Sequence, residues 1–172
     1  DKNDREVKNL SETAREKGKL VGVVTTDLVT GATPAAFSAH VESREFSEEI
    51  AEDQLEFRPD ILFGGNDDCF TSDNIAEAGM TQVATKKQMD QLTAEDTFVL
   101  GLFDRDELSQ GSTDEDTPTL VEMAQKSISL MEKNKNGFFL AIEEGHIDKA
   151  SHENNLDLMI RHQLQLDDLI KY

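Results

Sequence analysis

The fold is decided by residues 138–153, which read FFLAIEEGHIDKASHE. The apolar run at 138–142 is short and uninterrupted, and Gly145 follows it closely. Such a run is typical of a buried strand in an α/β sheet, where helices cover both faces of the strand. We therefore predict a buried strand here, and it ends at a carboxylate, Glu143.

Three side chains with metal-binding atoms follow this run: Glu143, Asp148 and His152. Ligands of α/β sheets bind at the carboxyl ends of the strands, which is where these residues fall. If Asp148 starts a helix, His152 lies one turn further on the same face, and both could hold one zinc or magnesium ion. On spacing alone an alternative is equally open, in which Asp148 caps a helix and His152 is a solvated helix residue.

The composition indicates an acidic globular protein. With 172 residues the chain is long enough for one hydrophobic core, and we predict a single domain over residues 1–172. It carries 17 Lys and Arg against 36 Asp and Glu, a net charge of −19. This charge argues against binding to nucleic acids or anionic membranes, because the field repels polyanions.

The single cysteine, Cys69, excludes an intramolecular disulfide. No apolar run approaches the roughly 18 residues of a membrane span, and no signal peptide is visible.

Strand and helix patterns alternate along the chain. Thr33-Pro34 and Thr117-Pro118 each combine an N-cap residue with a first-turn proline, and each predicts the start of a helix. The acidic segment 104–117 is expected to be an exposed loop. We predict strands at residues 20–25, 60–63, 97–103 and 138–142, and helices at 7–14, 33–37, 46–55, 117–133 and 156–169. This alternation indicates an α/β fold of three layers, in which a mostly parallel open sheet carries helices on both faces.

Four blocks of the sequence resemble bacterial alkaline phosphatases. They are VGVVTT at 21–26 with ATPAA at 32–36, AHVESR at 39–44, DILFGG at 60–65, and the stretch from Glu143 to His152. Their order and intervals also match, and the resemblance covers nearly all of the chain from Lys19 onward. It implies an alkaline phosphatase-like fold, of which this chain is a part. It also implies metal-dependent hydrolysis of phosphate monoesters through a phosphoserine intermediate.

The resemblance assigns metal ligands. Glu143, through its carboxylate, and Thr33, through its hydroxyl, would bind Mg²⁺. Asp148 and His152 would bind one of the two Zn²⁺ ions of the intact enzyme. Without the resemblance, Thr33 is better explained as an ordinary helix N-cap.

The resemblance also assigns two phosphate contacts. Arg44 would clamp the substrate phosphate, since a planar guanidinium can bind two phosphate oxygens at once. Lys149 would lie near the phosphate through a water molecule. Without the resemblance, Arg44 is a solvated cation at a helix end.

Gly31 departs from the family, because many bacterial relatives have Asp and animal relatives have His at this position. That side chain supports the magnesium shell and interacts with the position of Lys149, so its absence leaves the identity of the third metal open.

The resemblance also marks what the chain lacks. The nucleophilic serine of the family lies in an Asp-Ser-Ala motif that does not occur here, and further zinc ligands belong downstream. Because the chain opens at Asp1 rather than Met and ends at Tyr172, we interpret it as an internal fragment that is inactive in isolation. The intact enzyme is expected to be an exported homodimer. His146 falls where the family varies and is not counted as a ligand, and His40 and His162 are interpreted as ordinary surface or core histidines.

Two alternative functions stay open. A non-catalytic acidic module that binds a divalent cation or a partner protein would explain the charge and the missing nucleophile. Another metal-dependent phosphotransfer enzyme of the same superfamily, such as a phosphomutase or a phosphodiesterase, would share the metal ligands. The block around Thr33 and the position of Arg44 favour the phosphomonoesterase.

Overall fold

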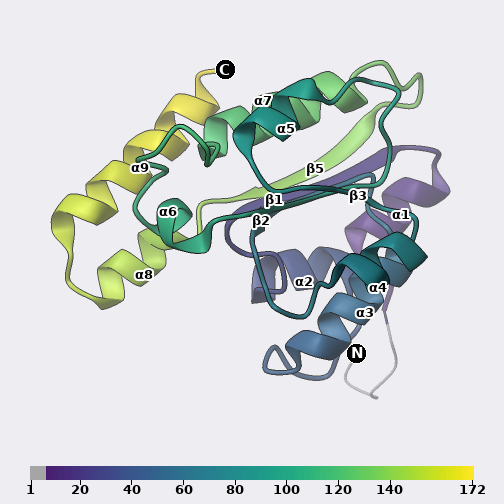
Figure 1. Ribbon diagram of the computed structural model, residues 1–172, viewed down its shortest axis with the longest axis horizontal. Coiled ribbons are helices and arrows are strands. Elements are labelled where there is room, and N and C mark those ends of the chain that lie inside the picture. Colours follow the sequence, from purple (N-terminus) through teal and green to yellow (C-terminus); the bar gives the residue numbers. More distant parts are fainter. Residues whose placement is uncertain (1–6) are drawn as a thin grey trace.

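The centre of the molecule is a sheet of five parallel strands (Figure 1). The structure is a computed structural model, and it describes residues 7–172. The strands are β1 (Leu20–Leu28), β2 (Ile61–Gly65), β3 (Thr81–Val83), β4 (Val99–Phe103) and β5 (Phe138–Glu143). Their order in the sheet is β3-β4-β2-β1-β5, so β1, the first strand in the sequence, lies beside the last.

Helices cover both faces of this sheet (Figure 1). On one face lie α5 (Lys86–Gln91), α6 (Arg105–Ser109), α7 (Leu120–Met131) and α9 (Leu156–Ile170). On the other lie α1 (Leu10–Glu16), α2 (Ala32–Ser38), α3 (Ser47–Phe57) and α4 (Ser72–Glu77). The short helix α8 (His146–His152) follows β5 and packs against α9. The predicted three-layer α/β/α fold with a parallel sheet is therefore confirmed.

The side chains of the strands point alternately to the two faces of the sheet, and each face carries its own hydrophobic cluster. Val24 and Phe63 point to the side of α7, whereas Val23 and Leu62 point to the side of α3. Successive side chains of a strand point to opposite faces, so one apolar run supplies both layers. The central strands β2 and β4 are buried at every residue. This explains why their sequences read as continuous apolar runs.

Strand β5 corrects the prediction of a fully buried strand. All its residues are half-buried, because β5 lies at the edge of the sheet and pairs only with β1 within residues 7–172. The register of this pair is regular and places Thr25 beside Glu143. The apolar run at 138–142 correctly indicated a strand. Composition alone could not tell an edge strand with apolar residues from a central one.

Both predicted helix caps were wrong by two residues. Helix α2 begins at Ala32 with Gly31 as its N-cap, so Thr33 lies inside the first turn. The cap of α7 is Thr119, which forms a capping box with Glu122. That box satisfies two backbone amides reciprocally, so the helix starts after Pro118 and not at it.

Three short helices were not predicted. Helices α4, α5 and α6 have five or six residues each, too few for a clear helical periodicity. Helix α8 was considered as a helix starting at Asp148, and it starts two residues earlier, at His146. Helix α6 lies in the segment 104–117, and its residue Leu108 is buried in the core, so this segment is not wholly an exposed loop. Among residues 7–172, every helix is too short or too polar to cross a membrane.

Candidate metal and phosphate site

The candidate site lies where β1 and β5 end side by side. Parallel strands present their carboxyl ends at one edge of the sheet, and ligands of α/β sheets bind there. The pairing of Thr25 with Glu143 brings the two strand ends together. The hydroxyl of Thr25 donates a hydrogen bond of 2.7 Å to Oε2 of Glu143. This bond orients the carboxylate at the end of β5.

Thr33 and Glu143, the proposed magnesium ligands, line one cavity of about 260 Å³. Pro34, Phe37 and Phe139 supply apolar walls of the same cavity. Because Gly31 and not Thr33 caps α2, the Thr33 hydroxyl is not committed to a helix cap. A carboxylate and a hydroxyl are both oxygen ligands of the kind that Mg²⁺ binds, so this pair fits a magnesium site.

Asp148 and His152, the proposed zinc ligands, lie on one face of α8. Helix α8 starts at His146 with Gly145 as its N-cap, so Asp148 does not cap the helix. Nε2 of His152 lies 3.5 Å from Oδ2 of Asp148, and the two side chains are 80% and 81% exposed. This one-turn spacing lets both side chains reach a single ion.

Among the residues that the structure describes, the two proposed zinc ligands are too few for a complete catalytic zinc site. Within residues 7–172, no three Cys, His, Asp or Glu side chains gather closely enough to hold a metal. Catalytic zinc sites use three protein ligands. The pair Asp148 and His152 therefore fits part of a zinc site and requires at least one further ligand.

Lys149 forms an ion pair with Asp27, a residue that the sequence analysis missed. Asp27 lies at the carboxyl end of β1, and only 17% of its side chain is exposed. The sequence contained a signal for Asp27. Ligands of α/β sheets bind at the carboxyl ends of strands, and this rule applies to Asp27 at the end of β1 just as it applies to Glu143 at the end of β5.

Arg44 lies apart from the other predicted residues. It is exposed in the turn between α2 and α3 and lines a cavity of about 300 Å³ with Ala32 and Ile50. Lys149 lines a different cavity, with Asp27 and His146. Among the described residues, the structure therefore brings Thr33 to Glu143 and Asp148 to His152, but it does not bring Arg44 and Lys149 to one cavity.

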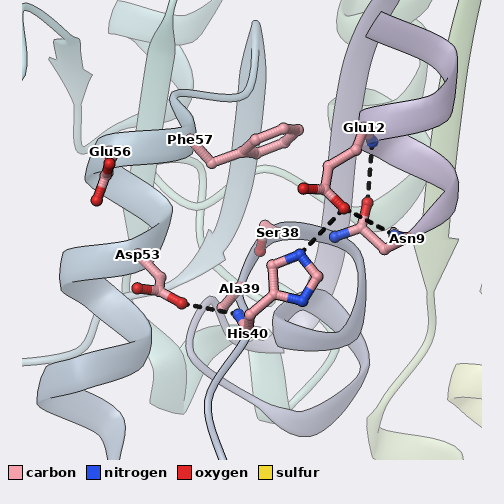
Figure 2. Close-up of a pocket in the computed structure, with 8 residues that line it drawn as sticks. All are labelled: Asn9, Glu12, Ser38, Ala39, His40, Asp53, Glu56 and Phe57. Carbon is pink, nitrogen blue, oxygen red and sulfur yellow. Dashed lines mark hydrogen bonds and ion pairs between the residues drawn. The ribbon is translucent and has the colours of Figure 1, made fainter. Parts of the chain in front are cut away.

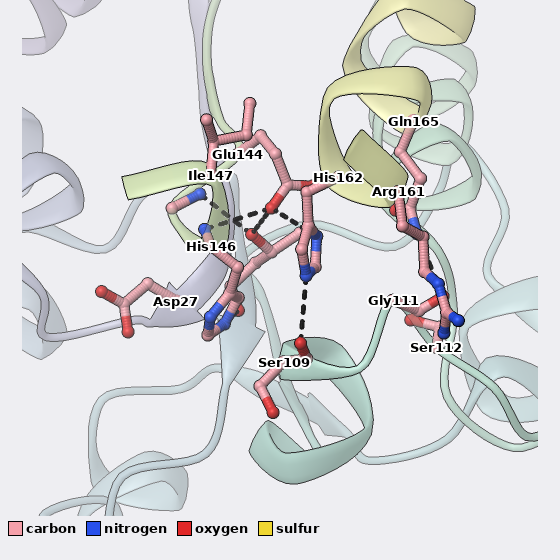
Figure 3. A network of polar contacts seen from close by, with 12 residues as sticks. Asp27, Ser109, Gly111, Ser112, Glu144, His146, Ile147, Arg161, His162 and Gln165 are labelled. Atoms are coloured by element: carbon pink, nitrogen blue, oxygen red, sulfur yellow. Dashed lines mark hydrogen bonds and ion pairs between the residues drawn. The ribbon is translucent and has the colours of Figure 1, made fainter. Parts of the chain in front are cut away.

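A buried polar network joins the start of α8 to α9 and α6 (Figure 3). Glu144 accepts a hydrogen bond of 2.6 Å from the hydroxyl of Thr26 and one of 3.2 Å from the backbone N–H of His146. Oε1 of Glu144 also lies 3.0 Å from Nδ1 of His162, and both side chains are fully buried. Nε2 of His162 donates to the carbonyl of Ser109 at 3.0 Å. The network therefore ties β5, α8, α9 and α6 together.

The two histidines of this network have opposite pKa shifts. Burial disfavours the charged form of His162, but the close contact with the negatively charged Glu144 outweighs it, and the pKa of His162 is raised above 6.5. Burial, helped by the charge of Lys149, lowers the pKa of His146. Nε2 of His146 donates to the carbonyl of Thr26 at 2.8 Å. His162 therefore keeps its proton to a higher pH than His146 does, and their ring centres lie 5.3 Å apart.

His40 lies in a separate surface cavity of about 330 Å³ (Figure 2). Its Nε2 lies 3.0 Å from Oε2 of Glu12, and its backbone N–H donates to Asp53 at 2.7 Å. Glu12 also accepts a hydrogen bond from the backbone N–H of Asn9 in the capping box of α1. These contacts fasten α1 to the turn after α2, which is a structural role.

Comparisons with known proteins identify the family of the chain and agree with its fold. A family model described as alkaline phosphatase matches residues 1–71 and 64–172. Alkaline phosphatase 4 of Bacillus subtilis is 35% identical over 168 residues, and the match covers 90% of this chain and 36% of that protein. Alkaline phosphatase of Schizosaccharomyces pombe is 34% identical over 181 residues, with coverages of 89% and 34%.

Solved structures of alkaline phosphatases are also similar to this chain. The cold-active alkaline phosphatase of a psychrophilic Shewanella sp. superposes with a TM-score of 0.90 at 33% identity, over 99% of this chain and 43% of that one. A variant of the alkaline phosphatase from the Antarctic bacterium TAB5, with Mg bound in its M3 site, has a TM-score of 0.79 at 27% identity, over 98% of this chain and 51% of that one. The chain thus spans between about a third and a half of the length of these relatives.

Proposed function

The chain belongs to the alkaline phosphatase family, and from this premise we propose that it forms part of a metal-dependent enzyme that hydrolyses phosphate monoesters. One observation carries the proposal. Thr33 and Glu143 lie far apart in the sequence, yet they line one cavity where β1 and β5 end. The proposed zinc ligands Asp148 and His152 follow on the next helix.

In the proposed mechanism each of the six proposed site residues has its own role. Thr33 and Glu143 hold Mg²⁺, for which the TAB5 variant offers a precedent. Asp148 and His152 hold one of two zinc ions. When bound, such metal ions stabilise the attacking and leaving oxygens of an in-line phosphoryl displacement and supply hydroxide at neutral pH.

Arg44 and Lys149 act on the substrate. The Arg44 guanidinium binds two non-bridging phosphate oxygens and offsets their negative charge. Lys149 acts on the phosphate through water. A serine supplied by another part of the protein attacks the phosphorus and forms the phosphoserine, because no Asp-Ser-Ala motif occurs in this chain. We therefore propose that the 172 residues alone do not turn over substrate.

The test uses the complete polypeptide that carries this chain. We expect it to hydrolyse p-nitrophenyl phosphate, to lose this activity on chelation, and to regain it with Zn²⁺ and Mg²⁺. Asp148→Ala and His152→Ala should each lower the zinc content measured by atomic emission and reduce the rate by at least tenfold. Asp168→Ala is the matched control, since this exposed residue at the end of α9 pairs with Lys171. Zinc content unchanged in Asp148→Ala would refute the ligand assignment.

The same preparation separates the alternatives. A complete polypeptide that binds divalent cations but hydrolyses no phosphomonoester would favour a cation-binding module. Preference for a phosphodiester or for intramolecular phosphate transfer would favour another member of the superfamily. The family resemblance also supports export of the protein and assembly as a homodimer, and light scattering after size exclusion tests the dimer.

A further inference from the structure

The carboxylate of Asp27 is held rigidly beside Lys149. The backbone N–H of Asp27 donates a hydrogen bond of 2.9 Å to the hydroxyl of Thr25. That hydroxyl in turn donates to Glu143 at 2.7 Å. Oδ1 of Asp27 also accepts a 2.7 Å hydrogen bond from the backbone N–H of Leu28. Asp27 is therefore connected by hydrogen bonds to the proposed magnesium ligand on one side and paired with Lys149 on the other.

Two glycines, Gly31 and Gly145, lie beside Asp27. A Cβ at Gly145 would lie 2.9 Å from Cβ of Asp27, so a side chain there would displace Asp27. A Cβ at Gly31 would lie 3.6 Å from Oδ2 of Asp27 and only 2.9 Å from the carbonyl oxygen of Leu28. The carboxylate of Asp27 therefore lies within van der Waals contact of the point where a side chain of residue 31 would begin.

We propose that Asp27 is a positioning residue for Lys149 and takes the place of the side chain that is absent at Gly31. The inference rests on the proposed function, in which Lys149 acts on phosphate. A lysine has a flexible stem and three donors, so its ammonium can turn toward any nearby anion. Asp27 holds the ammonium at the end of β1, and Lys149 then reaches a bound phosphate only through water.

This arrangement has a consequence for phosphate affinity. Asp27 and a bound phosphate compete for the same ammonium. Removing the carboxylate charge frees Lys149 to bind phosphate directly through a charge-assisted hydrogen bond. We therefore expect Asp27→Asn to tighten the binding of inorganic phosphate by about tenfold, the gain from one additional hydrogen bond between charged groups. In the wild-type protein, Asp27 thus keeps product affinity low.

The experiment measures the Kd of inorganic phosphate by calorimetry and its Ki in the phosphatase assay, on the complete polypeptide. Asp27→Glu should keep the wild-type values, because it restores the carboxylate. Asp106→Asn should also keep them. This nearby residue in α6 is 95% exposed and pairs with Arg105, so it controls for the loss of one negative charge.

The role through Lys149 is tested in a second background. In Lys149→Met, the further change Asp27→Asn should alter phosphate affinity by less than about twofold, since no ammonium is left to redirect. A tenfold effect that persists in Lys149→Met, no effect of Asp27→Asn in the wild type, or an equal effect of Asp106→Asn would each overturn the inference. A merely structural role for Asp27 predicts weaker phosphate binding in both backgrounds, and this too would overturn it.

The two readouts separate this inference from the proposed function. If the complete polypeptide binds phosphate with the predicted dependence on Asp27 but turns over no ester, the positioning role stands and the phosphatase proposal fails. If it hydrolyses esters but Asp27→Asn leaves Kd and Ki unchanged, the phosphatase proposal stands and the positioning role fails. A wild-type protein that binds no phosphate overturns both.

Discussion

Replacement of Glu144 by alanine should destabilise the protein by an amount that depends on pH. The change removes three contacts, with the hydroxyl of Thr26, the backbone N–H of His146 and the ring of His162. It leaves the fully buried imidazolium of His162 without its counter-charge. Removing one partner of a buried ion pair costs about 3–5 kcal/mol. Oε2 of Glu144 is buried and has no hydrogen-bond partner among residues 7–172, so we expect the lower end, about 3 kcal/mol.

The sign of the pH dependence follows from the pKa of His162. This pKa is raised in the folded state, so the stabilisation by the pair is fully present below the unfolded value of 6.5. It is lost as the pH rises through the folded pKa. At high pH the imidazole is neutral, and Glu144→Ala then costs only its hydrogen bonds, about 2 kcal/mol or less. The lowered pKa of His146 acts in the opposite direction below about pH 6.5, but its largest cause, burial, is common to wild type and variant.

The assay is urea unfolding followed by circular dichroism, for wild type and variant, from about pH 6 to about pH 9. Glu153→Ala is the matched control, because this residue is exposed at the end of α8 and should change the free energy of unfolding by no more than about 0.5 kcal/mol. A loss below 1 kcal/mol for Glu144→Ala at about pH 6, or a loss that grows toward high pH, would refute the assignment of a charged His162.

Three further predictions concern the rest of the molecule. Burial, together with the neighbouring Asp67, raises the pKa of Cys69 to about 11, so we expect slow alkylation by iodoacetamide at about pH 8. Asp67→Asn should accelerate this labelling, measured by mass spectrometry, and an unchanged rate would count against the contribution of Asp67. Thr119→Ala removes the cap of α7 and should lower the free energy of unfolding by about 1 kcal/mol, whereas Thr119→Ser should retain most of it. Phe63→Ala leaves a cavity in the core beside Phe103 and should cost about 3–5 kcal/mol in urea unfolding, and a cost below 1 kcal/mol would contradict its full burial.

Local sequence patterns were sufficient for the main strands and for the fold class. The apolar runs of β1, β2, β4 and β5 were each located to within a few residues, because a strand covered by helices must be apolar on both faces. Strand β3 was missed because it has three residues, of which two are exposed. The cap of α7 was placed two residues early, because Thr117-Pro118 imitates a helix start and the true capping box follows directly.

In the candidate site, too, contacts within one segment could be predicted from the sequence, whereas contacts between distant segments could not. The contact between Asp148 and His152 followed from helical geometry, since residues four apart lie on one face of a helix. The pair Asp27 and Lys149 and the pair Glu144 and His162 could not be derived in this way. Each joins segments whose distance in space depends on the order of strands in the sheet.

The amino-acid sequence by itself determined the strands β1, β2, β4 and β5, the parallel three-layer fold, the family resemblance and the local pair of proposed zinc ligands. These features depend on residue type and on periodicity within one segment. Only the tertiary structure decided that β5 lies at the edge of the sheet, that Thr25 orients Glu143, and that Asp27 lies next to Gly31 and Lys149. Strand order and register arise from packing between distant segments, and no local pattern in the chain encodes them.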